Sequence, residues 1–404
     1  MNTMQATAMR APAQRVLPRA ADTQKVRLGY VAAVLLCLVA ACVQNYVGAL
    51  AAMGFALTAG VVQNGRLAFG RLSVAFGLLA LFVVARSLLP SQLPMYVQLE
   101  EALRYLAFAF FATAVARMRI AELVLAASLW IVIIALPYPA YLFFDAFSIA
   151  DSAGAVRYSS ILPHANHLGY VAGAILIGLS YLHFAKVTAV PRYWVLAFLG
   201  VALVVASRSS GGVIFVVVGL SCLPLAMGLS RRTVLLAVLG AIAVALLMFS
   251  PLGEAAMDKL LNFDLRTVTQ KAQRYQFGNQ GSSFAWRLSY WLAMIDANIA
   301  SGPFYTLFGQ GGGATGLSNR VFSFMNKDPH SDIVRLFVEF GAVGLGLTLL
   351  AFIKVCLASR TPLIAGVILF TPMLTGNSLT SSPVILVLII MLVALDKGFL
   401  RKTT

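Results

Sequence analysis

Three arginines, Arg157, Arg208 and Arg287, lie in polar segments that border long apolar runs. The segment around Arg208 is the shortest, because Ser207 to Gly212 alone separates two apolar runs, and this places the guanidinium at a membrane surface. Guanidinium groups keep their charge and match phosphate oxygens with paired hydrogen bonds, and nearby serine hydroxyls and glycine amides add donors. The arginines predict a site for a diphosphate, although each alone also fits pairing with lipid phosphates or a loop carboxylate.

His330 is the candidate proton acceptor. The run Asp328, Pro329, His330, Ser331, Asp332 predicts a helix start, with Asp328 as N-cap and His330 in the first turn. The positive end of that helix, with arginines nearby, favours a neutral imidazole, which can take a proton from a hydroxyl group as a general base. The carboxylates of Asp328 and Asp332 instead favour the charged imidazolium, so a purely structural role for His330 stays open.

The other histidines and a glycine run allow two interpretations each. His164 and His167 flank Asn166, where they line the same site or cap the following helix, while His183 lies near the far end of that helix as packing. The glycine run at 309–313 is a candidate phosphate loop. Without a preceding strand, however, it is more typical of a turn in which two backbones approach closely.

Several other kinds of chemistry are missing from the sequence. It contains no DxD, Walker, HExxH or GxSxG motif and no CxxC or Cys/His cluster. The cysteines lie in or beside apolar runs as small core residues: Cys37, Cys42, Cys222 and Cys356. Arg335 and Glu339 are four residues apart, which predicts an ion pair within one helix. We therefore expect neither a metal ion nor a cofactor.

The elements that must position these residues are membrane helices. The 404 residues are 60% hydrophobic and 11% charged, with a mean hydropathy of +0.87, whereas soluble domains carry roughly a quarter charged residues. Because one span needs about 20 apolar residues, we expect an all-α polytopic membrane protein with about twelve spans. The predicted spans begin near Leu28, Gly48, Leu67, Leu103, Leu123, Leu168, Tyr193, Val213, Val234, Ile333, Pro362 and Pro383.

The distribution of charge orients the chain. A net charge of +16 would suggest nucleic acid in a soluble protein, but these cations lie in short loops between apolar segments, so no nucleic-acid partner is expected. With the N-terminus inside, every even-numbered loop faces the cytoplasm and contains basic residues, whereas Arg157, Arg208 and Arg287 lie on the outer side. The predicted regions are a disordered cytoplasmic tail at 1–27, spans one to nine at 28–249, a periplasmic loop with short helices at 250–332, spans ten to twelve at 333–396, and a cytoplasmic tail at 397–404. Within the large loop, residues 283–299 predict an aromatic helix at the membrane interface.

Residues spread over most of the chain resemble the O-antigen ligase and polymerase family of bacterial envelope glycosyltransferases. The matching elements are Arg157 with Pro163 and Asn166, the turn Ser207, Arg208, Ser209 with Gly211, Arg287 with Trp291, Gly309 with Gly311, and His330 followed by Glu339, Gly341 and Gly344. Ser331 stands where the family usually has Asn.

The resemblance implies a GT-C-like fold and an inverting, metal-independent transfer of polysaccharide from undecaprenyl pyrophosphate to the lipid A core. It places the protein in the bacterial inner membrane among membrane lipids, with the active site facing the periplasm, while the charge of the loops predicts that both termini are cytoplasmic. It implies catalytic roles for His330, Arg287 and Arg208. Residues that it implies for binding the diphosphate and glycan are Arg157, Asn166, Ser207, Trp291, Gly309 and Gly311.

Two alternatives to a ligase remain. A polymerase, which extends lipid-linked repeats, has the same chemistry, and we favour the ligase because of the chain length and the single large loop. A transporter or flippase of lipid-linked glycan belongs to another class. It is disfavoured because such proteins place carboxylates at mid-membrane, and acidic residues are nearly missing from the predicted spans.

Overall fold

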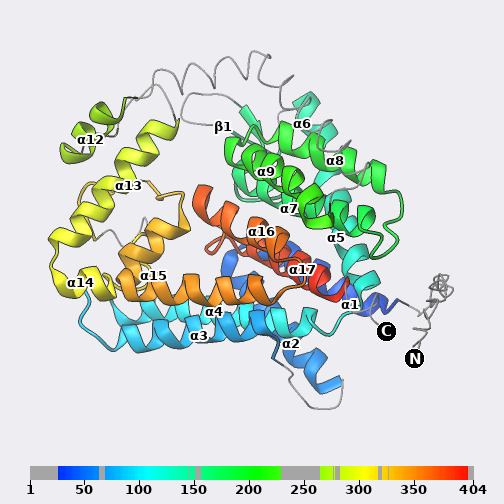
Figure 1. Ribbon diagram of the computed structural model, residues 1–404, viewed down its shortest axis with the longest axis horizontal. Coiled ribbons are helices and arrows are strands. Elements are labelled where there is room, and N and C mark those ends of the chain that lie inside the picture. The colour runs from blue at the N-terminus through cyan, green and yellow to red at the C-terminus, as the bar shows by residue number, and fades with distance from the viewer. Residues whose placement is uncertain are drawn as a thin grey trace, which may run out of the picture.

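The computed structural model describes residues 26–62, 69–144, 146–150, 156–228, 264–275, 277, 283–316, 321–325 and 327–398. Helices make up 75% of the structure, in agreement with the predicted helical class (Figure 1). The elements are α1 (Leu28–Val43), α2 (Asn45–Val62), α3 (Arg71–Ser87), α4 (Met95–Val115), α5 (Ile120–Ala135), α6 (Tyr138–Phe144), β1 (Ser148–Ala150), β2 (Val156–Tyr158), α7 (Ala165–Phe184), α8 (Tyr193–Ala206), α9 (Ser210–Met227), α12 (Leu265–Gln273), α13 (Ser283–Ala300), α14 (Pro303–Phe308), α15 (Asp332–Ala358), α16 (Pro362–Thr375) and α17 (Ser382–Gly398).

Four helical stretches are long and apolar enough to cross a membrane. They are Ile120–Phe144, which covers α5 and α6, and the helices α7, α9 and α15. The helices α1, α8 and α16 are shorter and also apolar. The described residues therefore support a helical protein with membrane-spanning segments. The predicted span near Val234 lies outside the described residues, as do most of both predicted tails, and the count of about twelve spans stays a prediction.

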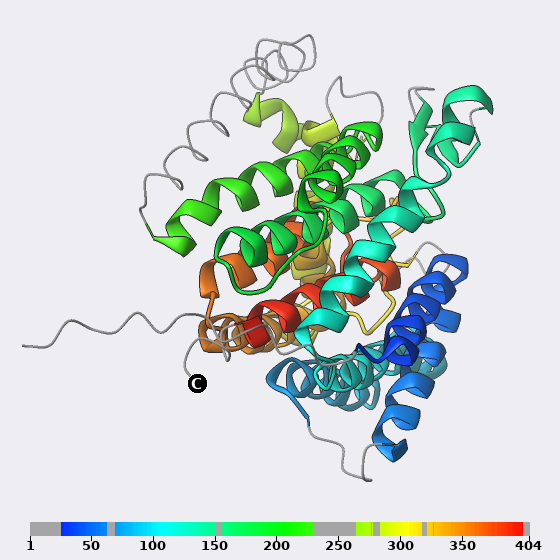
Figure 2. The same cartoon turned by 90° about the vertical axis from the view of Figure 1, so that its right-hand side faces the viewer.

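Helix α17 forms the centre of the bundle. It contacts α1, α2, α4, α5, α7 and α16, and its side chains from Val384 to Leu395 are all buried. A helix that is apolar and buried on every side belongs inside a bundle, away from the lipid. In both ribbon views α17 runs between the group α5, α7 and α8 and the group α1 to α4 (Figures 1 and 2).

Helices α7 and α9 begin side by side because glycine lets their backbones touch. A Cβ atom on Gly212 would lie 2.8 Å from the Cα atom of Gly169, and one on Gly169 would lie 3.2 Å from the Cα atom of Gly212. Small residues allow this close approach between membrane helices. The turn between α8 and α9, which carries Ser207 and Arg208, is thereby brought against the N-terminus of α7.

The β1–β2 hairpin is fastened to the end of α5. Its strands pair antiparallel, with Ile149 opposite Arg157. Tyr158 and Ser160 both donate hydrogen bonds to the carbonyl oxygen of Ile134, at 3.0 and 2.7 Å. Because neighbouring side chains of a strand point to opposite faces, the buried Tyr158 leaves Arg157 facing the other way.

Helices α13 and α14 pack on the first part of α15, and α12 packs on α13. Figure 1 shows these three helices together at one side of the molecule. Their shared core is aromatic, with the ring of Tyr290 5.1 Å from that of Phe277 and 6.2 Å from that of Phe324. The predicted aromatic helix over 283–299 is confirmed as a helix, α13. Its place at a membrane interface stays a prediction.

Helix α15 is interrupted at Gly341, where φ is 67°. The glycine run after α14 packs against this interruption: a Cβ atom on Gly309 would lie 2.3 Å from the carbonyl carbon of Glu339. The amide of Gly311 donates to the carbonyl oxygen of Glu339 at 2.9 Å. The run therefore supplies hydrogen bonds that the helix loses at the kink, which confirms the predicted close approach of two backbones.

Candidate functional site

Arg157 connects strand β2 with two other elements. Its Nη2 donates to Oδ1 of Asn166 at the start of α7, at 2.7 Å, and its Nε donates to the carbonyl oxygen of Ser207 in the α8–α9 turn, at 3.1 Å. The same half-buried guanidinium group donates both hydrogen bonds. Three residues that the sequence singled out separately thus form one cluster at the N-terminus of α7.

His164 is the N-cap of α7 and also belongs to this cluster. Its Nδ1 accepts the amide hydrogen of Asn166 at 3.0 Å. Its ring centroid lies 5.7 Å from that of His167 and 6.2 Å from that of His330. The two interpretations of His164, as a helix cap and as part of the site, are therefore both compatible with its position.

Helix α13 brings Arg287 and Trp286 to the same place. The ring centroid of Trp286 lies 6.1 Å from that of His330, and the guanidinium carbon of Arg287 lies 6.0 Å from the Trp286 ring. The Nε of Arg287 is buried and has no hydrogen-bond partner among the described residues. A buried, unpaired donor beside an imidazole is what an anionic ligand would satisfy.

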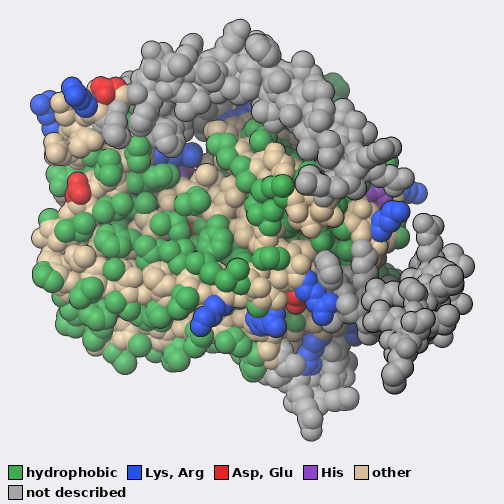
Figure 3. Space-filling view, in the orientation of Figure 1, with side chains coloured by type: hydrophobic (Ala, Val, Ile, Leu, Met, Phe, Trp, Pro, Cys, Tyr) green, Lys and Arg blue, Asp and Glu red, His purple; other side chains and the backbone are tan. Residues whose placement is uncertain are grey.

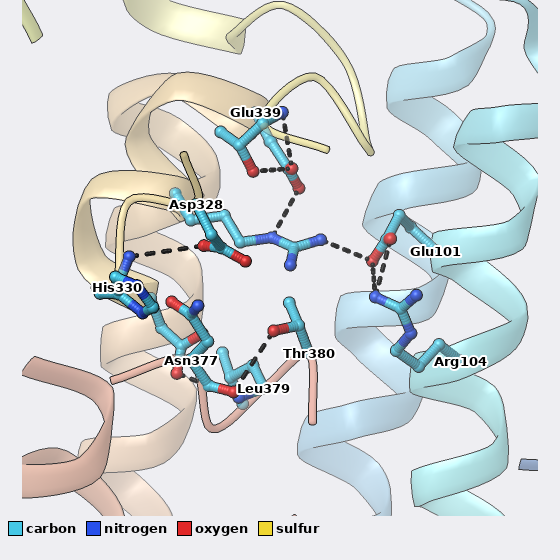
Figure 4. A network of polar contacts seen from close by, with 11 residues as sticks. Glu101, Arg104, Asp328, His330, Glu339, Asn377, Leu379 and Thr380 are labelled. Carbon is cyan, nitrogen blue, oxygen red and sulfur yellow. Dashed lines mark hydrogen bonds and ion pairs between the residues drawn. The ribbon is translucent and has the colours of Figure 1, made fainter. Parts of the chain in front are cut away.

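The structure corrects the predicted helix start around His330. The N-cap of α15 is Ser331 and its first residue is Asp332, so His330 precedes the helix and Asp328 is not the cap. His330 has a φ of 52°, in the left-handed region. Pro329 leads into this bend, and the carboxylate of Asp328 accepts the backbone amide of His330 at 3.4 Å, as Figure 4 shows. The side chain is therefore positioned by a bend and not by a helical turn.

Two aromatic side chains of α13 hold this bend from the other side. Tyr290 donates its hydroxyl hydrogen to the carbonyl oxygen of Lys327 at 2.7 Å, and Trp291 donates its indole N–H to the carbonyl oxygen of Pro329. Trp291, predicted to bind glycan, thus contacts the backbone next to His330. Sequence reasoning missed the role of Tyr290, which is buried in the aromatic core of α13.

Burial and positive charge keep the imidazoles neutral. Burial, with the positive charge of Arg287, lowers the pKa of His330 to about 3. Burial and the guanidinium groups of Arg157 and Arg287 lower the pKa of His164, and burial lowers the pKa of Arg287. The site therefore disfavours additional positive charge, and it favours an anion.

A buried cluster of charges lies behind the bend. Arg335 of α15 forms ion pairs with Glu339, at 3.2 Å, and with Glu101 of α4, at 3.1 Å, and Glu101 binds Arg104 at 2.8 Å (Figure 4). The predicted pair of Arg335 and Glu339 is confirmed. Asp328 is attracted by Arg335, while burial raises the pKa of Asp328. The cluster thus reaches from the bundle core to the residue that binds the His330 amide.

Apart from the pair of Arg335 and Glu339, this cluster was not predicted from the sequence. Acidic residues are nearly missing from the predicted spans, but Glu339 is buried inside the span predicted from Ile333, and Glu101 is buried two residues before the span predicted from Leu103. A signal was present in the sequence, because Glu101 and Arg104 are three residues apart at the start of a long apolar run. Charged residues inside an apolar helix are expected to face the bundle interior and to pair with one another.

The loop between α16 and α17 contacts the buried charges near the His330 bend. Its role was also not predicted from the sequence. Asp332 accepts hydrogen bonds from the hydroxyl of Ser378 at 2.6 Å and from the amide of Leu379 at 3.0 Å. The Asn377 amide lies against Asp328 and favours its charged form (Figure 4). Helix α15 therefore begins in a position fixed by a distant loop.

Three of the predicted site residues, Arg208, Gly309 and Gly311, lie outside the cluster at the N-terminus of α7. The Arg208 side chain is exposed, and no hydrogen bond or ion pair joins it to any described residue, although its neighbour Ser207 binds Arg157. Gly309 and Gly311 are buried against the kink of α15, with their amides bonded to the carbonyl oxygens of Tyr305 and Glu339. The structure thus brings together His330, Arg287, Arg157, Asn166, Ser207 and Trp291.

The space-filling view shows basic and histidine side chains inside a hollow beside α13 (Figure 3). Within the described ranges, no group of three or more His, Cys, Asp and Glu side chains could hold a metal ion. The arrangement therefore offers guanidinium donors, neutral imidazoles and aromatic faces. Neither a protein-family model nor a curated protein sequence matches the chain.

Proposed function

We propose that this protein is a glycosyltransferase of the bacterial inner membrane that transfers a glycan from undecaprenyl pyrophosphate to the lipid A core. The observation that carries the proposal is the convergence of Arg157 and Arg287 with His330 at one end of α7 and α15. Two guanidinium groups suit a diphosphate, and a neutral imidazole beside them suits an acceptor hydroxyl. In this proposal the site faces the periplasm and both termini are cytoplasmic.

Arg157 and Arg287 bind the diphosphate of the donor. As the bond between the anomeric carbon and the phosphate oxygen breaks, the electron pair leaves with the diphosphate, and the guanidinium groups stabilise that charge. The acceptor hydroxyl attacks the opposite face of the sugar, so the anomeric configuration inverts. Arg208, exposed beside the cluster, meets the same phosphates at the membrane surface.

His330 takes the proton from the attacking hydroxyl. A pKa near 3 makes the His330 imidazole a weak base on its own, because burial and the charge of Arg287 oppose the imidazolium. A bound diphosphate neutralises the guanidinium charges and so raises the pKa of His330 toward the working range. In this scheme the donor activates the base, and no metal ion takes part.

The test offers purified protein in detergent one lipid-linked glycan and two acceptors, lipid A core and a second lipid-linked repeat. We expect lipid A core to be extended, with no inhibition by a chelator. His330→Ala should lose roughly 100- to 10,000-fold in turnover. Arg287→Lys, which removes the planar fork, should lose roughly 100- to 1,000-fold.

His183→Ala is the matched control, because His183 lies at the other end of α7 and stacks on Tyr193 with ring centroids 4.1 Å apart. It should keep full turnover. Extension of the lipid-linked repeat alone would identify a polymerase. Failure to extend either acceptor in detergent would contradict the proposal.

A further inference from the structure

His164 combines a structural contact with a position inside the site. Its Nδ1 accepts the amide hydrogen of Asn166 at 3.0 Å, so Nδ1 carries no proton. The proton of the neutral ring is therefore on Nε2, which makes the outer edge of the ring a hydrogen-bond donor. No described residue accepts this hydrogen. His330, by contrast, is assigned as an acceptor, so the two imidazoles offer opposite functions.

The surroundings of His164 are those of an anion site. Arg157 binds Asn166, two residues away, through Oδ1 at 2.7 Å. The positive charges of Arg157 and Arg287 both act on the His164 ring, and the His330 ring centroid is 6.2 Å away. A phosphate bound by the two arginines would meet the donor edge of His164 in the same space.

The cap alone does not require histidine. Asn, Asp and Ser are the preferred N-cap residues, and each offers an acceptor without placing an imidazole ring near the charges of two guanidinium groups. His164 is partly exposed, so its ring stays accessible to a ligand. A ligand oxygen could accept the hydrogen of Nε2.

We propose that His164 is a further catalytic residue, a neutral donor whose Nε2–H binds a diphosphate oxygen of the donor lipid while Nδ1 caps α7. This inference rests on the proposed transferase function and adds a third donor to Arg157 and Arg287. The hydrogen bond strengthens as charge builds up on the departing diphosphate, with no proton transferred to it.

The decisive variant is His164→Asn, which keeps a capping acceptor and removes the ring donor. We expect the melting temperature of this variant, measured in detergent without ligand, to match that of the parent. Turnover should fall roughly 100-fold or more. Inorganic pyrophosphate should raise the melting temperature of the parent clearly and that of the variant much less. His164→Ala, which loses the cap as well, should also melt at a lower temperature.

His183→Asn is the control, since it makes the same substitution at the other end of the same helix, and it should change neither turnover nor the pyrophosphate effect. If His164→Asn lowers the melting temperature, His164→Ser provides a second capping residue for the same comparison. A capping variant with full turnover and a full pyrophosphate effect would show that the ring is only a cap. A parent that extends neither acceptor, but whose stabilisation by pyrophosphate depends on His164, would refute the transferase proposal and retain this anion site.

Discussion

At the scale of single residues, the site depends on imidazoles that stay neutral among guanidinium groups. His330 sits in a left-handed bend, held through its backbone by Asp328 on one side and by Trp291 on the other. Its ring faces Trp286 and His164. Backbone strain of about 1–3 kcal/mol at such positions persists only where surrounding contacts enforce it, and these contacts are present here.

The depressed pKa of His330 predicts a specific pH dependence of stability. The folded protein holds this ring neutral down to about pH 3, whereas the unfolded chain protonates it below its usual 6.5. The stabilisation is therefore present above pH 6.5 and is lost as pH falls toward 3, by at most about 1.4 kcal/mol per pH unit. His330→Gln removes the titrating ring. Melting temperatures measured at about pH 7.5 and about pH 5 should fall less in this variant than in the parent; equal losses would contradict the prediction.

At the scale of elements, the kink of α15 and the glycine run form one unit. The kink lets the amide of Gly311 bond to α15 and places the first turns of α15 under the bend that carries His330. Arg86 of α3 adds to this unit, because its Nε donates to the carbonyl oxygen of Phe308 at 2.6 Å. The glycine run therefore affects the site indirectly, because it stabilises the kink that sets the direction of the first turns of α15.

Gly309→Ala should destabilise the fold by about 2–4 kcal/mol, from the left-handed backbone and the overlap of the new Cβ atom with Glu339 together. Gly346→Ala is the control, since a Cβ atom there meets nothing within 4 Å and alanine favours a helix. Chemical unfolding in detergent measures both. If the two variants have the same stability, the close approach at Gly309 is not needed.

At the scale of the whole molecule, the two ends of the bundle differ chemically. Helix α7 runs from the site at His164 to the stacked His183, and α15 runs from Asp332 to a C-terminus whose Ala358 carbonyl oxygen accepts from Arg71. At this second end, Lys397 also donates to the carbonyl oxygen of Met118. The basic residues of the first end belong to the site, whereas Arg71 and Lys397 of the second end bond only to backbone carbonyl oxygens in these contacts, which fits the orientation that we propose.

Labelling of introduced cysteines tests this orientation. Lys327 beside the site and Lys186 beyond α7 are both exposed. In intact cells without an outer-membrane barrier, Lys327→Cys should react with a membrane-impermeant maleimide, and Lys186→Cys should react only after the membrane is permeabilised. The parent, with its four native cysteines, provides the background. The reverse pattern would place the site in the cytoplasm.

Much of the architecture followed from local sequence. Apolar runs predict helices that begin where α1, α8 and α16 begin, because both helix formation and burial in lipid depend on composition within a short window. The residue types also selected Arg157, Arg208, Arg287 and His330 as candidates for one chemistry, because a guanidinium group keeps its charge and a neutral imidazole can act as a base.

Only the tertiary structure decided which candidates meet. It joined Arg157 to Asn166 and Ser207, left the Arg208 side chain exposed, and used Gly309 to shape a helix. In the structure His330 also precedes the helix in which the local pattern predicts it. These outcomes depend on contacts between segments far apart in sequence, whose energies arise from close packing and buried charge that no local window contains.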